Sequence, residues 1–191
     1  MLKAVVCLSI FLAVKAEESF ISKGQWLLES IGECDRADMY EIQFNITRYR
    51  WTRGVDAVNA TFDLSRDVTI HHSFEINVEK MTNGGWKNYQ IIKHHSFLQF
   101  IRNNTGENFD RLMNHMNLEY SDPDPIPKNK YIIHLFIIDI CQLPEEGIIG
   151  EYRATTYLFD ETGVIISCAI AYVTFTEEGD ICGRKTEDED K

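Results

Sequence analysis

The feature that most constrains this chain is a strict alternation of apolar and polar residues over positions 58–78. Nine of the eleven even positions in this range are apolar, and all ten odd positions are polar. Because successive side chains of a β-strand point to opposite faces of the sheet, the pattern predicts half-buried strands with one wet face. A turn or bend is expected at residues 65–67, which divides the range into two strands. Positions 40–46 follow the same even-position rule and predict a further strand.

The rest of the chain continues this plan with one interruption. Asn83, Gly84 and Gly85 predict a turn. Residues 96–117 have apolar positions three and four apart, which predicts short helices broken near residues 104–106. Strands are expected again at 131–140, 151–159 and 164–175. Six or more strands with short turns predict an all-β fold with minor helix, built as a sandwich or an open barrel.

The first sixteen residues differ in kind from the rest. A basic start at Lys3, an apolar run over positions 4–14 and a small residue at Ala16 predict a signal peptide at 1–16, with a buried N-terminal helix as the alternative. The remainder is expected to comprise a lead segment at 17–33, one β domain at 34–176 and an acidic tail at 177–191. The protein is therefore predicted to be secreted and extracellular.

The net charge of the chain is −11, and it becomes −13 if Lys3 and Lys15 leave with the signal peptide. Phosphate binding needs clustered Lys and Arg, so this acid excess argues against a nucleic-acid partner. It also disfavours electrostatic docking on anionic lipid, although transient membrane contact stays open.

Cysteines and sequons fit an extracellular chain. Four cysteines follow the expected signal peptide, and an even count predicts two disulfides with three possible pairings. Zinc is disfavoured because no two cysteines have Cys-x-x-Cys spacing. Three Asn-x-Thr sequons predict glycosylation. The cysteines are Cys34, Cys141, Cys168 and Cys182, and the sequon asparagines are Asn45, Asn59 and Asn103.

No motif for catalysis, a metal or a cofactor stands out. The sequence has no Gly-x-Ser-x-Gly, no His-Glu-x-x-His and no phosphate-cradling glycine-rich loop, so a non-enzyme is predicted. The pairs His71–His72 and His94–His95 place adjacent rings on opposite strand faces, which does not favour chelation. His72 occupies an even position, where the neighbouring strand residues are apolar, so its side chain is expected to face the interior. It is either a structural residue there or a polar contact for a ligand headgroup.

A series of short landmarks suggests a family. In chain order they are Cys34-Asp35, Glu79-Lys80 followed by Gly85-Trp86-Lys87, Leu143-Pro144 followed by Gly150-Glu151-Tyr152-Arg153, and Thr162-Gly163 followed by Cys168-Ala169-Ile170. Over about residues 34–175 the chain resembles the insect chemosensory protein B-type family, a group related to the ganglioside activator protein, a lipid-recognition β-cup. The chain departs from the activator after Trp86, where His94, His95 and Phe97 stand in a region that carries extra cysteines in the activator. Ligand identity is therefore not carried over.

The resemblance implies an immunoglobulin-like β-sandwich or β-cup around an apolar cavity, with the short helices near its mouth. It implies a Cys34–Cys168 disulfide, which leaves Cys141 and Cys182 as the second pair. The implied function is binding of a lipid or hydrophobic pheromone in gustatory detection, with a sensory receptor or channel as a further partner. The residues expected to line the cavity are Phe62, Phe74, Ile76, Trp86, Phe97, Phe100, Ile133, Leu135, Leu158 and Ile166.

Two other functions remain open. An activator or transfer protein would present a lipid to a hydrolase, using exposed apolar segments such as 97–98 and 148–149. A packed β-sandwich would bind another protein instead of a ligand.

Overall fold

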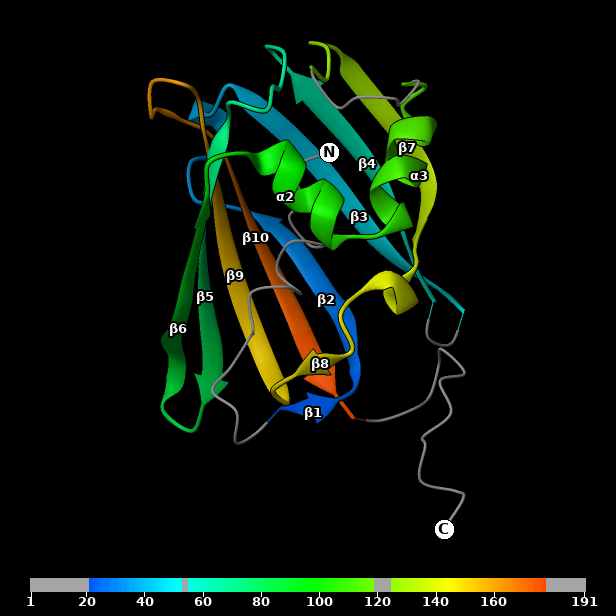
Figure 1. Ribbon diagram of the computed structural model, residues 1–191, viewed down its shortest axis with the longest axis vertical. Helices are drawn as coiled ribbons and strands as arrows, with labels where there is room; N and C mark the ends of the chain where they lie inside the picture. The colour runs from blue at the N-terminus through cyan, green and yellow to red at the C-terminus, as the bar shows by residue number, and fades with distance from the viewer. Residues whose placement is uncertain (1–20, 53–54, 119–124, 178–191) are drawn as a thin grey trace.

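The computed structural model describes residues 21–52, 55–118 and 125–177, so the expected signal peptide and the tail beyond residue 177 lie outside it. Two antiparallel sheets face each other, and two short helices lie between them at one edge (Figure 1). The predicted all-β sandwich with minor helix is confirmed.

Five strands form the larger sheet and three form the smaller one. The larger sheet has the order β2 (Gln25–Glu33), β10 (Ile165–Thr176), β9 (Gly150–Phe159), β5 (Ser73–Thr82) and β6 (Gly85–His94). The smaller has the order β3 (Ile42–Thr52), β4 (Val55–Leu64) and β7 (Lys130–Ile138). The short strands β1 (Ser22–Lys23) and β8 (Glu146–Gly147) pair with each other. The helices are α2 (Phe97–Asn104) and α3 (Glu107–His115), with 3-10 turns η1 (Ala37–Met39) and η2 (Ile140–Gln142).

The predicted alternation sets the faces of β4 and β5. Phe62 and Ile76 are fully buried, whereas Asp63 is exposed. The inner faces of both sheets contribute to one hydrophobic cluster, as the period-two pattern requires.

The folded body begins before Cys34. Strand β2 lies within the expected lead segment 17–33 and forms an edge of the larger sheet, where it pairs with β10. Trp26 and Leu28 bury their side chains from this strand. The register shifts between Tyr172 and Val173, and this irregularity interrupts the alternation that would have revealed β2 in the sequence.

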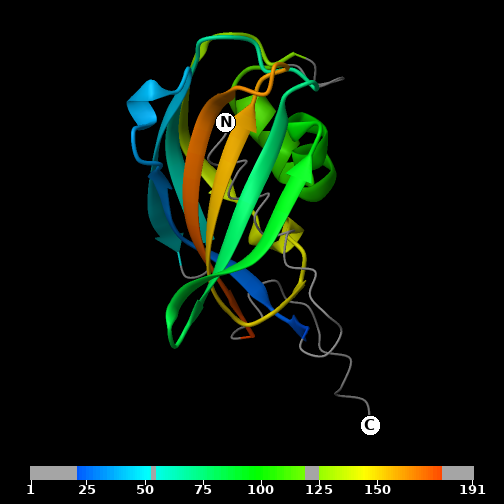
Figure 2. The same cartoon turned by 90° about the vertical axis from the view of Figure 1, so that its left-hand side faces the viewer.

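The two sheets are joined directly along one edge. The Arg48 guanidinium donates to the Glu29 carbonyl at 3.0 Å, and the Ser167 hydroxyl donates to the Ile42 carbonyl at 3.0 Å. The opposite edge, between β6 and β7, is where α2 and α3 lie, on the far side of the molecule from η1 (Figure 2). The sandwich is therefore closed by strands on one side and by helices on the other.

The expected Cys34–Cys168 disulfide is present, with its Cα atoms 5.8 Å apart. Cys141 is also disulfide-bonded, and Cys182, its expected partner, lies outside the described residues.

Candidate functional site

Helix α2 is held by its apolar face. Ser96 caps its N-terminus by accepting a hydrogen bond from the Gln99 amide. Phe97, Leu98 and Ile101 are fully buried. The helix predicted from the spacing of Phe97, Phe100 and Ile101 is confirmed. Phe97 and Leu98 are thus not an exposed apolar segment, one of the two that the transfer-protein alternative proposed. In the other segment, Ile149 is 47% exposed and Ile148 is partly buried.

Helix α3 is tied to the end of β7. Asn108 and Asp139 exchange two side chain–backbone hydrogen bonds, each 2.9 Å long. Arg111 donates to the Ile137 carbonyl at 2.8 Å, and its guanidinium lies 5.6 Å from the centre of the Phe136 ring. Helices α2 and α3 together are named the helical cover, because they span the edge between β6 and β7 (Figure 1).

Most residues expected to line a cavity do face the interior. Phe100 is half-buried, with its ring centre 4.7 Å from that of Phe74. Seven are buried: Phe62, Phe74, Ile76, Phe97, Ile133, Leu158 and Ile166. Their contact with a ligand stays a prediction.

Trp86 and Leu135 lie elsewhere, and a β-bulge accounts for each. Tyr89 is an extra residue in β6, so Trp86 lies on the outer face with its ring 5.2 Å from the Arg153 guanidinium. In β7 the register shifts beside Leu135, which has φ 52° and is 38% exposed. Phe136 takes the buried position instead.

The centre of the larger sheet has small side chains on its inner face. Ala154 on β9 pairs with Ala171 on β10, and Thr156 pairs with Ala169. All four are 0% exposed. These four residues are named the small-residue floor. Large side chains flank it, from β5 on one side and from β2 on the other: Phe74, Ile76, Val78, Trp26 and Leu28.

One polar group of this floor has no partner. The Thr156 hydroxyl is buried and makes no hydrogen bond with any described residue. An unmet buried hydroxyl costs about 1–3 kcal/mol, so a strand centre is a costly place for it. Thr105, between α2 and α3, has a hydroxyl in the same state.

His72 is also a buried residue with a polar side-chain atom that has no hydrogen-bond partner among the described residues. It is 3% exposed, and its Nδ1 accepts from the Thr69 amide at 3.1 Å. The neutral ring then carries its proton on Nε2, which has no partner among the described residues. Burial lowers the pKa of His72 below 6.5, against the opposing effect of the nearby Glu161 carboxylate.

The lowered pKa of His72 predicts acid sensitivity. The unfolded state binds a proton below about pH 6.5 and the folded state resists it, so folding stability falls with falling pH, by at most about 1.4 kcal/mol per pH unit. Urea unfolding at pH 7.5 and 5.5 should show this pH dependence in the wild type and a weaker one in His72→Gln. The exposed control His71→Gln should show the same pH dependence as the wild type. An identical pH dependence in His72→Gln would contradict the assignment.

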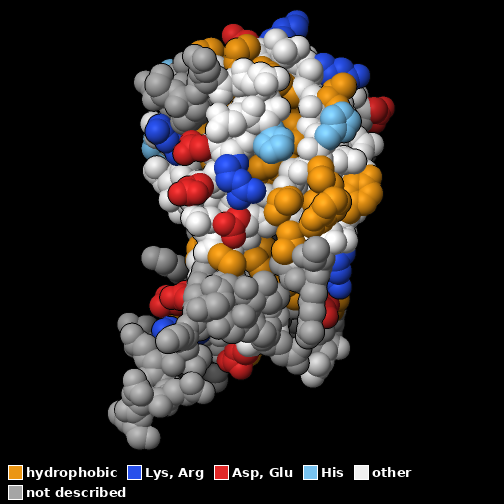
Figure 3. Space-filling model, turned by 90° about the vertical axis from the view of Figure 1, so that its right-hand side faces the viewer, with side chains coloured by type: hydrophobic (Ala, Val, Ile, Leu, Met, Phe, Trp, Pro, Cys, Tyr) orange, Lys and Arg blue, Asp and Glu red, His pale blue; other side chains and the backbone are white. Residues whose placement is uncertain are grey.

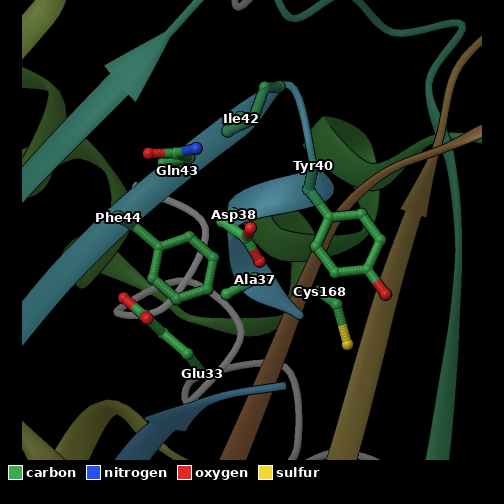
Figure 4. Close-up of a pocket in the computed structure, with 8 residues that line it drawn as sticks. All are labelled: Glu33, Ala37, Asp38, Tyr40, Ile42, Gln43, Phe44 and Cys168. Carbon is green, nitrogen blue, oxygen red and sulfur yellow. The ribbon is translucent and has the colours of Figure 1, made fainter. Parts of the chain in front are cut away.

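A small crevice lies at the edge of the sandwich opposite the helical cover, beside the Cys34–Cys168 bond. It has a volume of about 150 Å³, and the end of β2, η1, β3 and β10 contribute its lining. Figure 4 shows the rings of Tyr40 and Phe44 at its sides, with Asp38 between them. This volume is below the roughly 300–1,000 Å³ of typical ligand pockets, so the crevice is not favoured as the main site.

Two sequons face each other on the outer surface of the smaller sheet. Asn45 pairs with Thr61 and Asn59 pairs with Thr47 across β3 and β4. Asn45 is exposed and Asn59 half-buried, and the third asparagine, Asn103, is exposed on α2. Glycosylation of all three stays a prediction.

The second histidine pair is built into the end of β6. The rings of His94 and His95 stack with centres 4.3 Å apart, and Nδ1 of His94 lies 2.8 Å from the Ser96 carbonyl oxygen. Within residues 21–52, 55–118 and 125–177, no three His, Cys, Asp or Glu side chains form a cluster that could hold a metal ion. In the same ranges, no helix is long and apolar enough to cross a membrane.

Comparison with known proteins finds a distant structural similarity. No family model and no curated protein matches the chain. Among solved structures, the chain is similar to the crystal structure of chicken MD-1 complexed with lipid IVa, at 14% identity and a TM-score of 0.39. The alignment covers 85% of this chain and 96% of that one. The fold assignment rests on the strand pairing described above.

Proposed function

We propose that this protein binds a hydrophobic or amphipathic small molecule between its sheets, over the small-residue floor. The observation that carries the proposal is the floor itself, with the unmet hydroxyl of Thr156 in it. We infer that the small volume of these four side chains leaves room for a ligand between the sheets, because an interior packs to high density only when that space is filled.

The helical cover supports access to such a site. Helices α2 and α3 have 8 and 9 residues, lengths that are marginal in isolation and depend on packing. Their movement away from the sheets would open the edge between β6 and β7. We infer that the ligand enters there.

The biological setting is proposed from the sequence. The signal peptide, the sequons and the Cys34–Cys168 bond favour a secreted glycoprotein, since disulfides persist in oxidising compartments. The resemblance to the insect chemosensory family favours a pheromone or other apolar cue as ligand, with a receptor or channel as partner.

The protein-interaction alternative is favoured by one surface. Hydrophobic side chains gather on the face of the molecule shown in Figure 3. Exposed residues of β3 and β7 include Trp51, which is 55% exposed, and Ile132, which is 58% exposed. A packed sandwich would use such a surface, rather than its interior, to bind another protein.

A substitution in the floor separates the two functions. Ala154→Phe places a ring in the ligand space, so we expect an apolar fluorescent dye to bind at least about tenfold more weakly than to the wild type, with stability retained. The matched control Thr155→Phe changes the outer face of the same strand and should leave dye binding unchanged. Wild-type protein that takes up no dye would contradict the proposed function.

A further inference from the structure

Lys80 lies on the inner face of the larger sheet. It has the same parity as the buried Ile76 and Val78, and it pairs with Tyr152 on β9 and with Lys87 on β6. Its ammonium is 5.6 Å from the centre of the Tyr152 ring, and that ring is buried. An acidic protein thus places two lysines next to each other at one end of this sheet face, Lys80 half-buried and Lys87 exposed.

The side chain of Lys80 is held in place. A Cβ atom added to Gly150 would lie 2.7 Å from Cε of Lys80, so the lysine stem crosses the bare backbone of this glycine. Lys80 is half-buried there, between Gly150 and the Tyr152 ring. A surface lysine that only extends into water lacks such packing contacts along its stem.

Within the part of the chain that the structure describes, no carboxylate forms an ion pair with Lys80. The acids of the neighbouring strands lie on the outer face, where Glu75 pairs with Lys93 and Glu79 with Arg153, each at 2.6 Å. Among the described residues, Lys80 and Lys87 have no acidic partner. Burial lowers the pKa of Lys80, because it removes water from around the ammonium.

The surroundings are apolar and continuous with the floor. Tyr89 lies with its ring 5.8 Å from that of Tyr152, and both Tyr89 and Ile148 are partly buried against the core. Along the sheet, the Lys80–Tyr152 pair is two residues from Val78–Ala154. Two residues of strand span about 7 Å, so the lysine lies one short step from the floor.

We propose that Lys80, with Lys87 beside it, binds the anionic headgroup of an amphipathic ligand, a carboxylate or a phosphate, whose tail lies over the small-residue floor. This inference rests on the proposed function. It adds that the ligand is a fatty-acid-like or phosphorylated lipid-like anion rather than a neutral hydrocarbon. An ammonium that forms a charge-assisted hydrogen bond with the headgroup gives about 1.5–3 kcal/mol, which corresponds to at least about tenfold in affinity.

The test is displacement of the bound dye from the full chain by oleate, oleoyl lysophosphatidate and oleyl alcohol, each below its aggregation concentration. The wild type should bind oleate or the lysophosphatidate at least about tenfold more tightly than the alcohol. Whichever anion is preferred assigns the headgroup to carboxylate or phosphate. Lys80→Gln should lose the preference and keep its affinity for the alcohol, which also shows that the variant is folded.

Lys93→Gln is the matched control, because it removes the same charge from the outer face and should keep the preference. Equal wild-type affinities for the anions and the alcohol, or an unchanged preference in Lys80→Gln, would overturn the headgroup site while leaving the proposed function intact. Displacement of the dye by inorganic phosphate or acetate alone would also overturn the amphipathic assignment. Failure of all three oleyl compounds and the dye to bind would instead overturn the proposed function.

Discussion

Replacing both Cys34 and Cys168 by alanine is expected to lower the free energy of unfolding by about 5 kcal/mol. The two residues are 134 positions apart, so their bond removes much of the conformational freedom of the unfolded chain. In the folded state it fixes the end of β2 to β10, close to the edge where the two sheets are joined.

Urea unfolding of the double variant, compared with the wild type under non-reducing conditions, measures this effect. The double variant avoids a free thiol that would form new bonds. A loss below about 2 kcal/mol would show that the bond contributes less than the chain-entropy account requires.

Replacing Phe97 by alanine is expected to cost about 3–5 kcal/mol, the usual range for a buried phenylalanine. Phe97 is 0% exposed, and its ring meets the Phe74 ring edge-on at 5.8 Å. The variant therefore loses both the burial that holds α2 and its aromatic contact with β5.

Gln99→Ala on the exposed side of the same helix is the control, and its effect should stay within about 0.5 kcal/mol. Since Phe97 anchors the helical cover, stopped-flow mixing should also show faster dye uptake by Phe97→Ala than by the control. A cost below 1 kcal/mol with unchanged uptake would show that the cover does not close the site.

The sequence predicts best those strands that carry no bulged residue themselves, because there the alternation of each strand alone sets which residues face inward. Strands β4 and β5 follow from residues 58–78, because every even position in this range that falls within the two strands is apolar. Trp86 and Leu135 were placed inside on the same ground, and bulges moved both of them. A bulge depends on how two strands pair, so the parity of one strand alone does not show it.

The small-residue floor could not be found from the sequence for a related reason. Ala154 and Thr156 look like ordinary strand residues, and their meaning comes from the partners Ala171 and Ala169 on β10. Lys80 similarly appeared only as part of a family landmark. Its inner position became evident once β5 was paired with β9.

The most direct test of ligand binding between the sheets is native mass spectrometry of protein secreted by eukaryotic cells and purified without detergent. We expect the wild type to carry one apolar or amphipathic molecule, or to take up one equivalent of dye or oleate, and Ala154→Phe to carry none while remaining folded. Wild-type protein without ligand or uptake, together with an Ala154→Phe variant destabilised by about 1–3 kcal/mol, would contradict this and indicate an interior that is already full.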